Sequence, residues 1–280
     1  MSTRTVLITG ATAGIGLECA AQIAPGAHLV LVGRSEAKLA AAADRVRAHG
    51  AAGVHTLTAD FAELDSVRAL AAAVLDRGDP IDVLVNNAGA VFAARTETVD
   101  GYEATFAVNH LAPYLLTETL EPLLLASAPA RVVITASTGH YRGDLDFDDL
   151  QYQRGGYSIM KAYARSKLAN VIYARSLAEE LAGAGVTVNA VHPGMVATDI
   201  WDGAPRLARP LLALVKRFRM ISPEEGGHRL CTLATDPALA ETTGRYFEDG
   251  AVVEPSAVAR DLQVARRLRR VSDELVAPRH

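Results

Sequence analysis

A tyrosine and a lysine four residues apart are the side chains in this sequence whose types and spacing could do chemistry. If Tyr163 and Lys167 lie on a helix, they share one face. An ammonium group close to a phenol lowers the pKa of the phenol, which suits proton exchange with a carbonyl oxygen near neutral pH. Tyr157 and Lys161 have the same spacing, but they lie beside Gly155-Gly156, where a helix is not yet established. We therefore assign proton transfer to Tyr163 and Lys167 and expect Tyr157 to line a pocket.

Two further polar side chains could act beside this pair. Ser137 follows a β-branched run, and a hydroxyl there could donate a hydrogen bond to a substrate oxygen and stabilise its developing charge. The adjacent Thr138 is the competing candidate for this role. Asn109 lies in a mostly apolar helical stretch, and because asparagine is a poor helix former, it answers a specific hydrogen-bonding need. An ordinary buried polar network is the alternative interpretation of Asn109.

A glycine-rich turn follows the first strand-like run, at residues 9–16. Gly10 permits a tight bend, Gly14 lets the backbone approach a pyrophosphate, and Gly16 allows a helix and a strand to pack closely. The spacing is G-x-x-x-G-x-G rather than the common G-x-G-x-x-G. A turn with a purely structural role is the alternative.

The elements that must position these residues alternate along the chain. Continuous apolar runs predict strands, and longer Ala- and Leu-rich segments predict helices between them. This alternation predicts an α/β fold, a single Rossmann-type doubly wound domain over residues 1–280 with a mainly parallel seven-stranded sheet flanked by helices. The predicted strands are 6–9, 28–32, 54–58, 83–85, 132–135, 186–191 and 244–247, and the predicted helices are 15–23, 36–49, 64–76, 102–125, 162–181 and 223–234. Within this domain we expect 199–222 to be a substrate lid and 251–280 a C-terminal helical extension.

Composition excludes several other classes of protein. The 280 residues, half of them hydrophobic, can bury a large core without disulfides. A net charge of −4 argues against a nucleic-acid partner. The two cysteines, Cys19 and Cys231, are too few and too far apart for a disulfide framework or a zinc site, so we expect no bound metal. No signal-peptide pattern and no apolar run of about 18 residues is present, so we expect a cytoplasmic protein.

Taken together, these segments resemble the short-chain dehydrogenase/reductase (SDR) family, in its retinol-dehydrogenase-like branch. The resemblance covers residues 6 to about 276, and it rests on the turn at 9–16, on Asn86-Asn87-Ala88-Gly89, on the YxxSK pattern at 163–167 and on Tyr246-Phe247 followed by an Arg-rich segment. It implies that Tyr163 is the general acid or base and that Ser137 polarises the substrate oxygen. It also implies that Lys167 grips the nicotinamide ribose and that Asn109 holds a water that relays protons to Lys167.

The same resemblance implies a nicotinamide dinucleotide as cofactor. Asp60 would face the adenine ring, and Ala88 and Gly89 would line the floor of the cofactor site. The segment after the sixth strand would hold the carboxamide and the phosphates. The expected cofactor contacts are Gly10, Thr12, Ala13, Gly14, Ile15, Gly16, Arg34, Asp60, Phe61, Asn87, Ala88, Gly89, Tyr163, Lys167, Pro193, Gly194, Val196 and Thr198.

The end of the second predicted strand bears on which nicotinamide cofactor binds. An acid there accepts hydrogen bonds from the ribose of NAD(H), whereas a cation suits the 2′-phosphate of NADP(H). The residues are Gly33-Arg34-Ser35, with no acid until Glu36. We therefore expect NADP(H) to be preferred over NAD(H), with a solvated Arg34 as the alternative. Ala13 departs from the family pattern, because many NADP-preferring relatives carry a basic residue there.

These observations predict an NADP(H)-dependent oxidoreductase that interconverts a carbonyl and an alcohol on a hydrophobic small molecule. The expected substrate contacts are Tyr141, Tyr157, Met195, Trp201 and Phe218. A non-redox enzyme on the same scaffold (a cyclase, dehydratase or isomerase) and an NADP(H)-sensing binding protein stay open as alternatives. For the apolar and basic segment 211–220 we favour a lid over membrane contact. Pairing of copies into a homo-oligomer is also left open.

Overall fold

The computed structural model describes residues 4–194 and 221–278. Within these residues the apolar runs form one sheet of eight strands, in the order β3-β2-β1-β4-β5-β6-β7-β8. Seven strands are parallel, and β8 pairs antiparallel with β7. The chain order reverses between β1 and β4, and parallel sheets bind ligands beyond the strand ends at such a point. The strands are β1 Thr5–Thr9, β2 His28–Gly33, β3 Gly53–Thr58, β4 Val83–Asn86, β5 Ala130–Thr135, β6 Val186–His192, β7 Tyr246–Glu248 and β8 Ala251–Val253.

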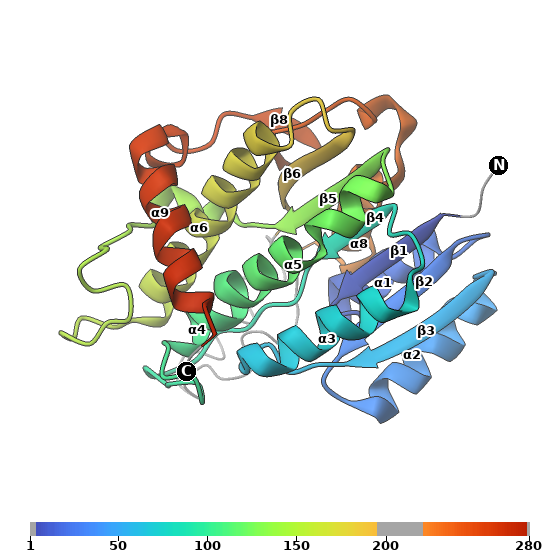
Figure 1. Cartoon of the computed structure of the whole chain (residues 1–280), viewed down its shortest axis with the longest axis horizontal. Coiled ribbons are helices and arrows are strands. Elements are labelled where there is room, and N and C mark those ends of the chain that lie inside the picture. Colours follow the sequence, from blue (N-terminus) through green and yellow to red (C-terminus); the bar gives the residue numbers. More distant parts are fainter. Residues whose placement is uncertain (1–3, 195–220, 279–280) are drawn as a thin grey trace.

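Helices cover both faces of this sheet (Figure 1). Because successive strand side chains point to opposite faces, Val6 and Ile8 of β1 enter one hydrophobic cluster and Leu7 enters the other. The first cluster is completed by α1 Gly14–Ile23, α2 Glu36–Ala48 and α8 Pro223–Thr235. The second is completed by α3 Leu64–Arg77, α5 Ala112–Ala126, α6 Ile159–Glu180 and α9 Leu262–Val276.

The predicted α/β architecture is confirmed, with two differences in the elements. The sheet has an eighth strand, because residues 249–250 turn the chain back and β8 pairs with β7, so the segment 251–280 is not wholly helical. The predicted helix 102–125 is divided into α4 Ala104–Phe106, one π-helical turn at Ala107–Leu111, and α5. In that wider turn the amide of Ala112 donates to the carbonyl of Ala107, five residues earlier.

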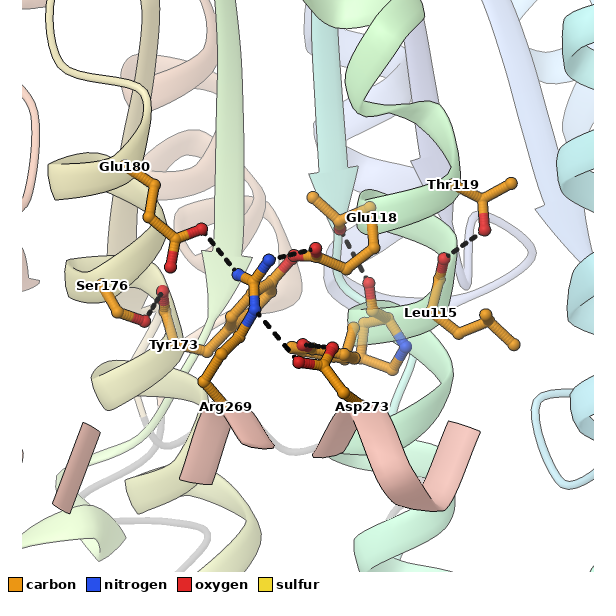
Figure 2. Close-up of polar contacts among 11 residues, drawn as sticks. Leu115, Glu118, Thr119, Tyr173, Ser176, Glu180, Arg269 and Asp273 are labelled. Atoms are coloured by element: carbon orange, nitrogen blue, oxygen red, sulfur yellow. Dashed lines mark hydrogen bonds and ion pairs between the residues drawn. The ribbon is translucent and has the colours of Figure 1, made fainter. Parts of the chain in front are cut away.

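The C-terminal helix α9 lies against α5 and α6 on the outer side of the second cluster (Figures 1 and 2). From α9, Arg269 forms ion pairs with Glu118 of α5 at 2.6 Å and with Glu180 of α6 at 2.7 Å. Tyr114 of α5 also donates a hydrogen bond to Asp273. The charge of Arg269 therefore attaches α9 to two helices of the core.

None of the described helices has the length and apolar composition that crossing a membrane requires.

Candidate active site

Ser137 and Tyr163 meet beyond the carboxyl end of β5. Ser137 follows β5 and caps the 3₁₀ turn Thr138–Arg142, with its hydroxyl accepting from the amide of Gly139 at 3.1 Å. A hydrogen bond joins the hydroxyls of Ser137 and Tyr163. A Cβ atom on Gly139 would lie 3.5 Å from the Tyr163 ring, in van der Waals contact with it, so this glycine lies directly beside the phenol. The structure thus brings Ser137, rather than the competing Thr138, to the tyrosine.

Tyr163 lies on α6, which begins at Ile159 with Ser158 as its N-cap. The Ser158 hydroxyl accepts from the amide of Lys161, as expected of an N-cap serine. Tyr157 therefore precedes the helix, and its hydroxyl donates to the carbonyl of Phe92 at 2.5 Å. The competing Tyr157–Lys161 pair does not share a helical face, which agrees with the preference for Tyr163.

Lys167 is buried one helical turn after Tyr163. Its ammonium donates to the carbonyl of Thr135 at 3.0 Å and lies 5.7 Å from the centroid of the Tyr163 ring. Burial lowers the pKa of Lys167 to about 8, because a charged ammonium is poorly solvated there. Burial also raises the pKa of Tyr163, with the Ser137 hydrogen bond acting in the opposite direction. The lowered tyrosine pKa expected from the Tyr–Lys spacing is not found, because desolvation of the phenol outweighs the neighbouring groups.

Asn109 comes from the π-helical turn and faces α6. Its amide oxygen accepts from the amide of Ala90 at 2.7 Å, and its amide nitrogen donates to Ser166 at 3.0 Å. A Cβ atom on Gly89 would lie 3.2 Å from that oxygen and 3.8 Å from the Lys167 nitrogen, so the glycine permits this close approach. Asn109 therefore sits beside Lys167, and its role in a proton relay stays a prediction.

The glycine-rich turn has the form that a phosphate group needs. Gly10 and Gly14 have φ of 67° and 52°, the left-handed region that suits glycine. A Cβ atom on Gly16 would lie 2.3 Å from the carbonyl oxygen of Gly10. Helix α1 starts after the exposed Ala13, with no side chain capping it and no acid in its first turn. Its first amide groups are thus open to an anion, so these residues fit a dinucleotide pyrophosphate.

The segment after β4 braces this turn. The side-chain amide of Asn87 donates to the carbonyl of Thr9 at 3.1 Å, and the backbone amide of Ala88 donates to the Thr9 hydroxyl at 3.0 Å. A Cβ atom on Gly33 would lie 2.5 Å from the methyl group of Thr12, which places the turn against the end of β2. Asn87, Ala88 and Thr12 therefore lie together at the edge where the strand order reverses.

Other expected cofactor contacts lie along the same edge. Arg34 follows β2, is exposed, and makes no hydrogen bond or ion pair to another described residue. The Asp60 carboxylate accepts from the amide of Ala62 at 2.9 Å, and the neighbouring Phe61 is buried in the second cluster. Beyond β6, Pro193 is buried and Gly194 has φ of 104°.

Comparison with known proteins identifies the family. The model of the short chain dehydrogenase family matches residues 4–206. The chain belongs to the short-chain dehydrogenase family. It is 39% identical to Retinol dehydrogenase 14 of Mus musculus over 290 residues, 99% of this chain and 86% of the mouse protein. It is 40% identical to Polyprenol dehydrogenase of Mus musculus over 273 residues, 95% of this chain and 81% of that protein.

A solved structure gives the same result. The Pseudomonas aeruginosa RhlG/NADP active-site complex has a TM-score of 0.70 and is 28% identical, with 89% of this chain and 95% of that chain covered. This chain is accordingly a short-chain dehydrogenase of the retinol-dehydrogenase-like kind, an oxidoreductase that acts on alcohols or carbonyls. Its fold and relatives support a nicotinamide cofactor.

The expected substrate contacts of this short-chain dehydrogenase are only partly described. Tyr141 is exposed, and its hydroxyl donates to Glu248 at 3.3 Å and to the carbonyl of Glu254 at 3.2 Å. Tyr157 is held against Phe92, as above. The remaining predicted contacts with substrate or cofactor, and most of the predicted lid 199–222, lie outside the described residues: Met195, Val196, Thr198, Trp201 and Phe218.

Thr135 and His140 complete the surroundings of this site. Thr135 supplies the carbonyl that anchors Lys167, and a backbone acceptor leaves no mark on the residue type. His140 is wholly buried, donates through Nδ1 to the carbonyl of Ser137 at 2.8 Å, and accepts through Nε2 from the amide of Ser256 at 3.2 Å. These two partners hold the imidazole neutral, and burial lowers its pKa.

Among the described residues, no cluster of three or more His, Cys, Asp or Glu side chains is arranged to hold a metal ion.

Proposed function

We propose that this short-chain dehydrogenase uses NADP(H) to interconvert a ketone or aldehyde and the corresponding alcohol on a hydrophobic small molecule. The observation that carries the proposal is the hydrogen-bonded pair of Ser137 and Tyr163 with the ammonium of Lys167 behind it. A phenol, a hydroxyl and an ammonium converge at one place, and the glycine turn that fits a pyrophosphate lies on the same edge of the sheet.

Each side chain has a defined task in the proposed reduction. When bound at the glycine-rich turn, a reduced nicotinamide would supply the hydride that the carbonyl carbon receives. Tyr163 donates its phenolic proton to the carbonyl oxygen, and Ser137 donates a hydrogen bond to the same oxygen while negative charge develops there. Lys167 then stabilises the phenolate by its positive charge. A raised Tyr163 pKa favours the protonated phenol at neutral pH, which is the form that reduction requires.

Two observations support the finer parts of the proposal. For the cofactor, Arg34 is an exposed cation at the end of β2, where a 2′-phosphate would lie, and the similar Pseudomonas aeruginosa protein was solved with NADP. For the substrate, the relatives include a retinol dehydrogenase and a polyprenol dehydrogenase, whose named alcohols are long and apolar. We propose a cytoplasmic location, as expected from the sequence.

Absorbance of the reduced nicotinamide tests the reaction. The enzyme is mixed with NADPH or NADH and a panel of apolar ketones and aldehydes. We expect loss of NADPH absorbance that depends on the carbonyl compound and is faster than with NADH. Tight NADPH binding with no consumption across a panel that includes retinal and a polyprenal would contradict the proposal and favour the sensing or non-redox alternatives.

The assignment of Tyr163 has a matched control. Tyr163→Phe should abolish turnover and leave NADPH binding within a few-fold of the native chain. Tyr152→Phe makes the same chemical change on a buried tyrosine whose hydroxyl has no hydrogen-bond partner among the described residues. We expect the Tyr152 variant to keep native turnover. Normal turnover by Tyr163→Phe would reject Tyr163 as the acid.

A further inference from the structure

A buried histidine that the mechanism does not use lies next to Asn109. His110 is 1% exposed, in the π-helical turn at Ala107–Leu111. Its ring packs against the rings of Phe106, Tyr114 and Tyr173, with centroids 5.0, 5.8 and 6.2 Å away. The titratable groups among these neighbours are the two phenols, and none of the three carries a charge at neutral pH. A polar ring in such surroundings must be fully hydrogen-bonded.

The hydrogen-bond partners of His110 fix which group donates and which accepts in each hydrogen bond from Ser272 to Thr135. Nδ1 lies 3.3 Å from the side-chain oxygen of Asn170, and Nε2 lies 2.9 Å from the hydroxyl of Ser272 on α9. The side-chain nitrogen of Asn170 donates to the carbonyl of Thr135 at 3.2 Å, so its oxygen is the end that faces His110. Nδ1–H therefore donates to Asn170, and the Ser272 hydroxyl donates to Nε2. A neutral imidazole meets both needs, and burial lowers the pKa of His110 to about 4.

The chain of bonds ends on the acceptor that holds the active-site lysine. Thr135 is the last residue of β5, and the pairing of β4 with β5 ends one residue earlier, at Asn86 opposite Ile134. The Thr135 carbonyl thus lies beyond the paired part of β4. It accepts from Asn170 at 3.2 Å and from the ammonium of Lys167 at 3.0 Å.

The π-helical turn therefore reaches α6 on both sides of Lys167. Asn109 donates to Ser166, the residue before the lysine, and His110 donates to Asn170, three residues after it. Ser166 in turn donates to the carbonyl of Tyr163 at 2.8 Å. Two consecutive residues of one turn thus hold the helix segment that carries both Tyr163 and Lys167.

We propose that His110 and Asn170, supported by Ser272 from the C-terminal helix, are positioning residues that hold the Thr135 carbonyl and hence the ammonium of Lys167. This inference rests on the proposed function, in which Lys167 stabilises the Tyr163 phenolate and binds the nicotinamide ribose. In this view α9 supplies a residue to the support of the active site as well as covering α5 and α6.

The test uses variants that each remove defined hydrogen bonds from the series that joins Ser272, His110, Asn170 and Thr135. His110→Phe keeps a ring of similar shape and removes both hydrogen bonds. His110→Asn places an amide nitrogen near the position of Nδ1 and so keeps the donor toward Asn170. Ser272→Ala cuts the far end and leaves the ring in place. Tyr114→Phe is the control, because it removes a hydrogen bond between α5 and Asp273 of α9 without touching the chain.

Three readouts separate positioning from plain stability. With a carbonyl substrate, His110→Phe should lower kcat by about tenfold, since small displacements of a reacting group are costly. The rising limb of alcohol oxidation against pH should move to higher pH, because a displaced Lys167 stabilises the phenolate less. NADPH titration by fluorescence should show weaker binding. His110→Asn should recover most of each loss, and Tyr114→Phe should match the native chain in all three.

Each outcome decides between the proposals. If His110→Phe and Tyr114→Phe behave alike, or if the pH profile and NADPH affinity of His110→Phe are native, the positioning role is rejected while the proposed function stands. If the native chain binds NADPH but reduces no carbonyl, the proposed function fails. The positioning role is then tested by comparing the NADPH affinity of His110→Phe with that of the native chain and of Tyr114→Phe. If His110→Phe does not fold, Ser272→Ala gives the same test with a smaller expected loss, and native values for it reject the involvement of α9.

Discussion

Arg34 offers the sharpest test of cofactor choice. Its guanidinium lies at the end of β2, exposed and without a hydrogen bond or ion pair to another described residue. The adjoining Gly33 touches the methyl group of Thr12 in the glycine-rich turn, so Arg34 borders the site that fits a dinucleotide. Arg34→Ala removes the cation and leaves the backbone of β2 unchanged.

The size of the effect follows from the setting of the guanidinium. A charge-assisted hydrogen bond contributes about 1.5–3 kcal/mol, and an exposed group is screened by solvent, which favours the lower end. About 1.5 kcal/mol corresponds to about a tenfold change in affinity. Arg34→Ala should therefore weaken NADPH binding about tenfold and leave NADH binding nearly unchanged, because NADH lacks the 2′-phosphate.

Fluorescence titration of each cofactor into native and variant chains measures the two dissociation constants. Lys38→Ala is the matched control, since Lys38 is also exposed and lies in the first turn of α2. Added salt should reduce the NADPH preference of the native chain, because exposed charges are screened. A specific contact between Arg34 and the 2′-phosphate would be refuted if Arg34→Ala weakened NADPH and NADH binding equally. It would also be refuted if Lys38→Ala lost as much NADPH affinity as Arg34→Ala.

Three further predictions concern the turn, the lysine and the C-terminal helix. Gly16→Ala should lower the free energy of unfolding by about 1–3 kcal/mol and weaken NADPH binding, because the new Cβ would lie 2.3 Å from the carbonyl oxygen of Gly10; urea unfolding and cofactor titration measure both, and native values for both would contradict the close packing. Lys167→Met should raise the free energy of unfolding by up to about 3 kcal/mol below pH 8, because burial lowers the lysine pKa from 10.5 to about 8. Between pH 8 and pH 10.5 the lysine of the unfolded chain keeps a proton that the folded chain has released. The native chain therefore becomes more stable as pH rises, and the stability gained by Lys167→Met should shrink. A stability gain that is constant from pH 7 to pH 10 would contradict the lowered lysine pKa. Arg269→Ala should lower the free energy of unfolding by about 1–3 kcal/mol, because two partly buried carboxylates lose their cation; urea unfolding near that of the native chain would show that α9 is held mainly by apolar contacts.

The parts of the site that could be predicted are those defined by local spacing. Tyr163 and Lys167 are placed by one helical turn, and Gly10, Gly14 and Gly16 by the tight bend between β1 and α1. The alternation of apolar runs and helical segments was enough to predict the parallel sheet, since each buried strand is continuous in the sequence.

The parts that could not be predicted depend on contacts between distant segments. The π-helical turn interrupts a helical pattern whose apolar residues continue without a break, because all five of its side chains are buried. The attachment of α9 depends on Glu118 and Glu180, which read as ordinary surface acids until Arg269 is brought between them. Thr135 acts through its carbonyl, which every residue type has.

The π-helical turn has a consequence for how this site can change during evolution or design. It holds one more residue than an α-helical turn, and this extra residue lets Asn109 and His110 both reach α6. Deleting one residue from Ala107–Leu111 would restore a regular helix without rotating the residues before it, because the wider turn already absorbs the extra residue. Of Asn109 and His110, at most one side chain would then still face α6. The turn is therefore expected to be kept or lost as a whole, with insertions and deletions tolerated far less here than substitutions elsewhere on the same helix.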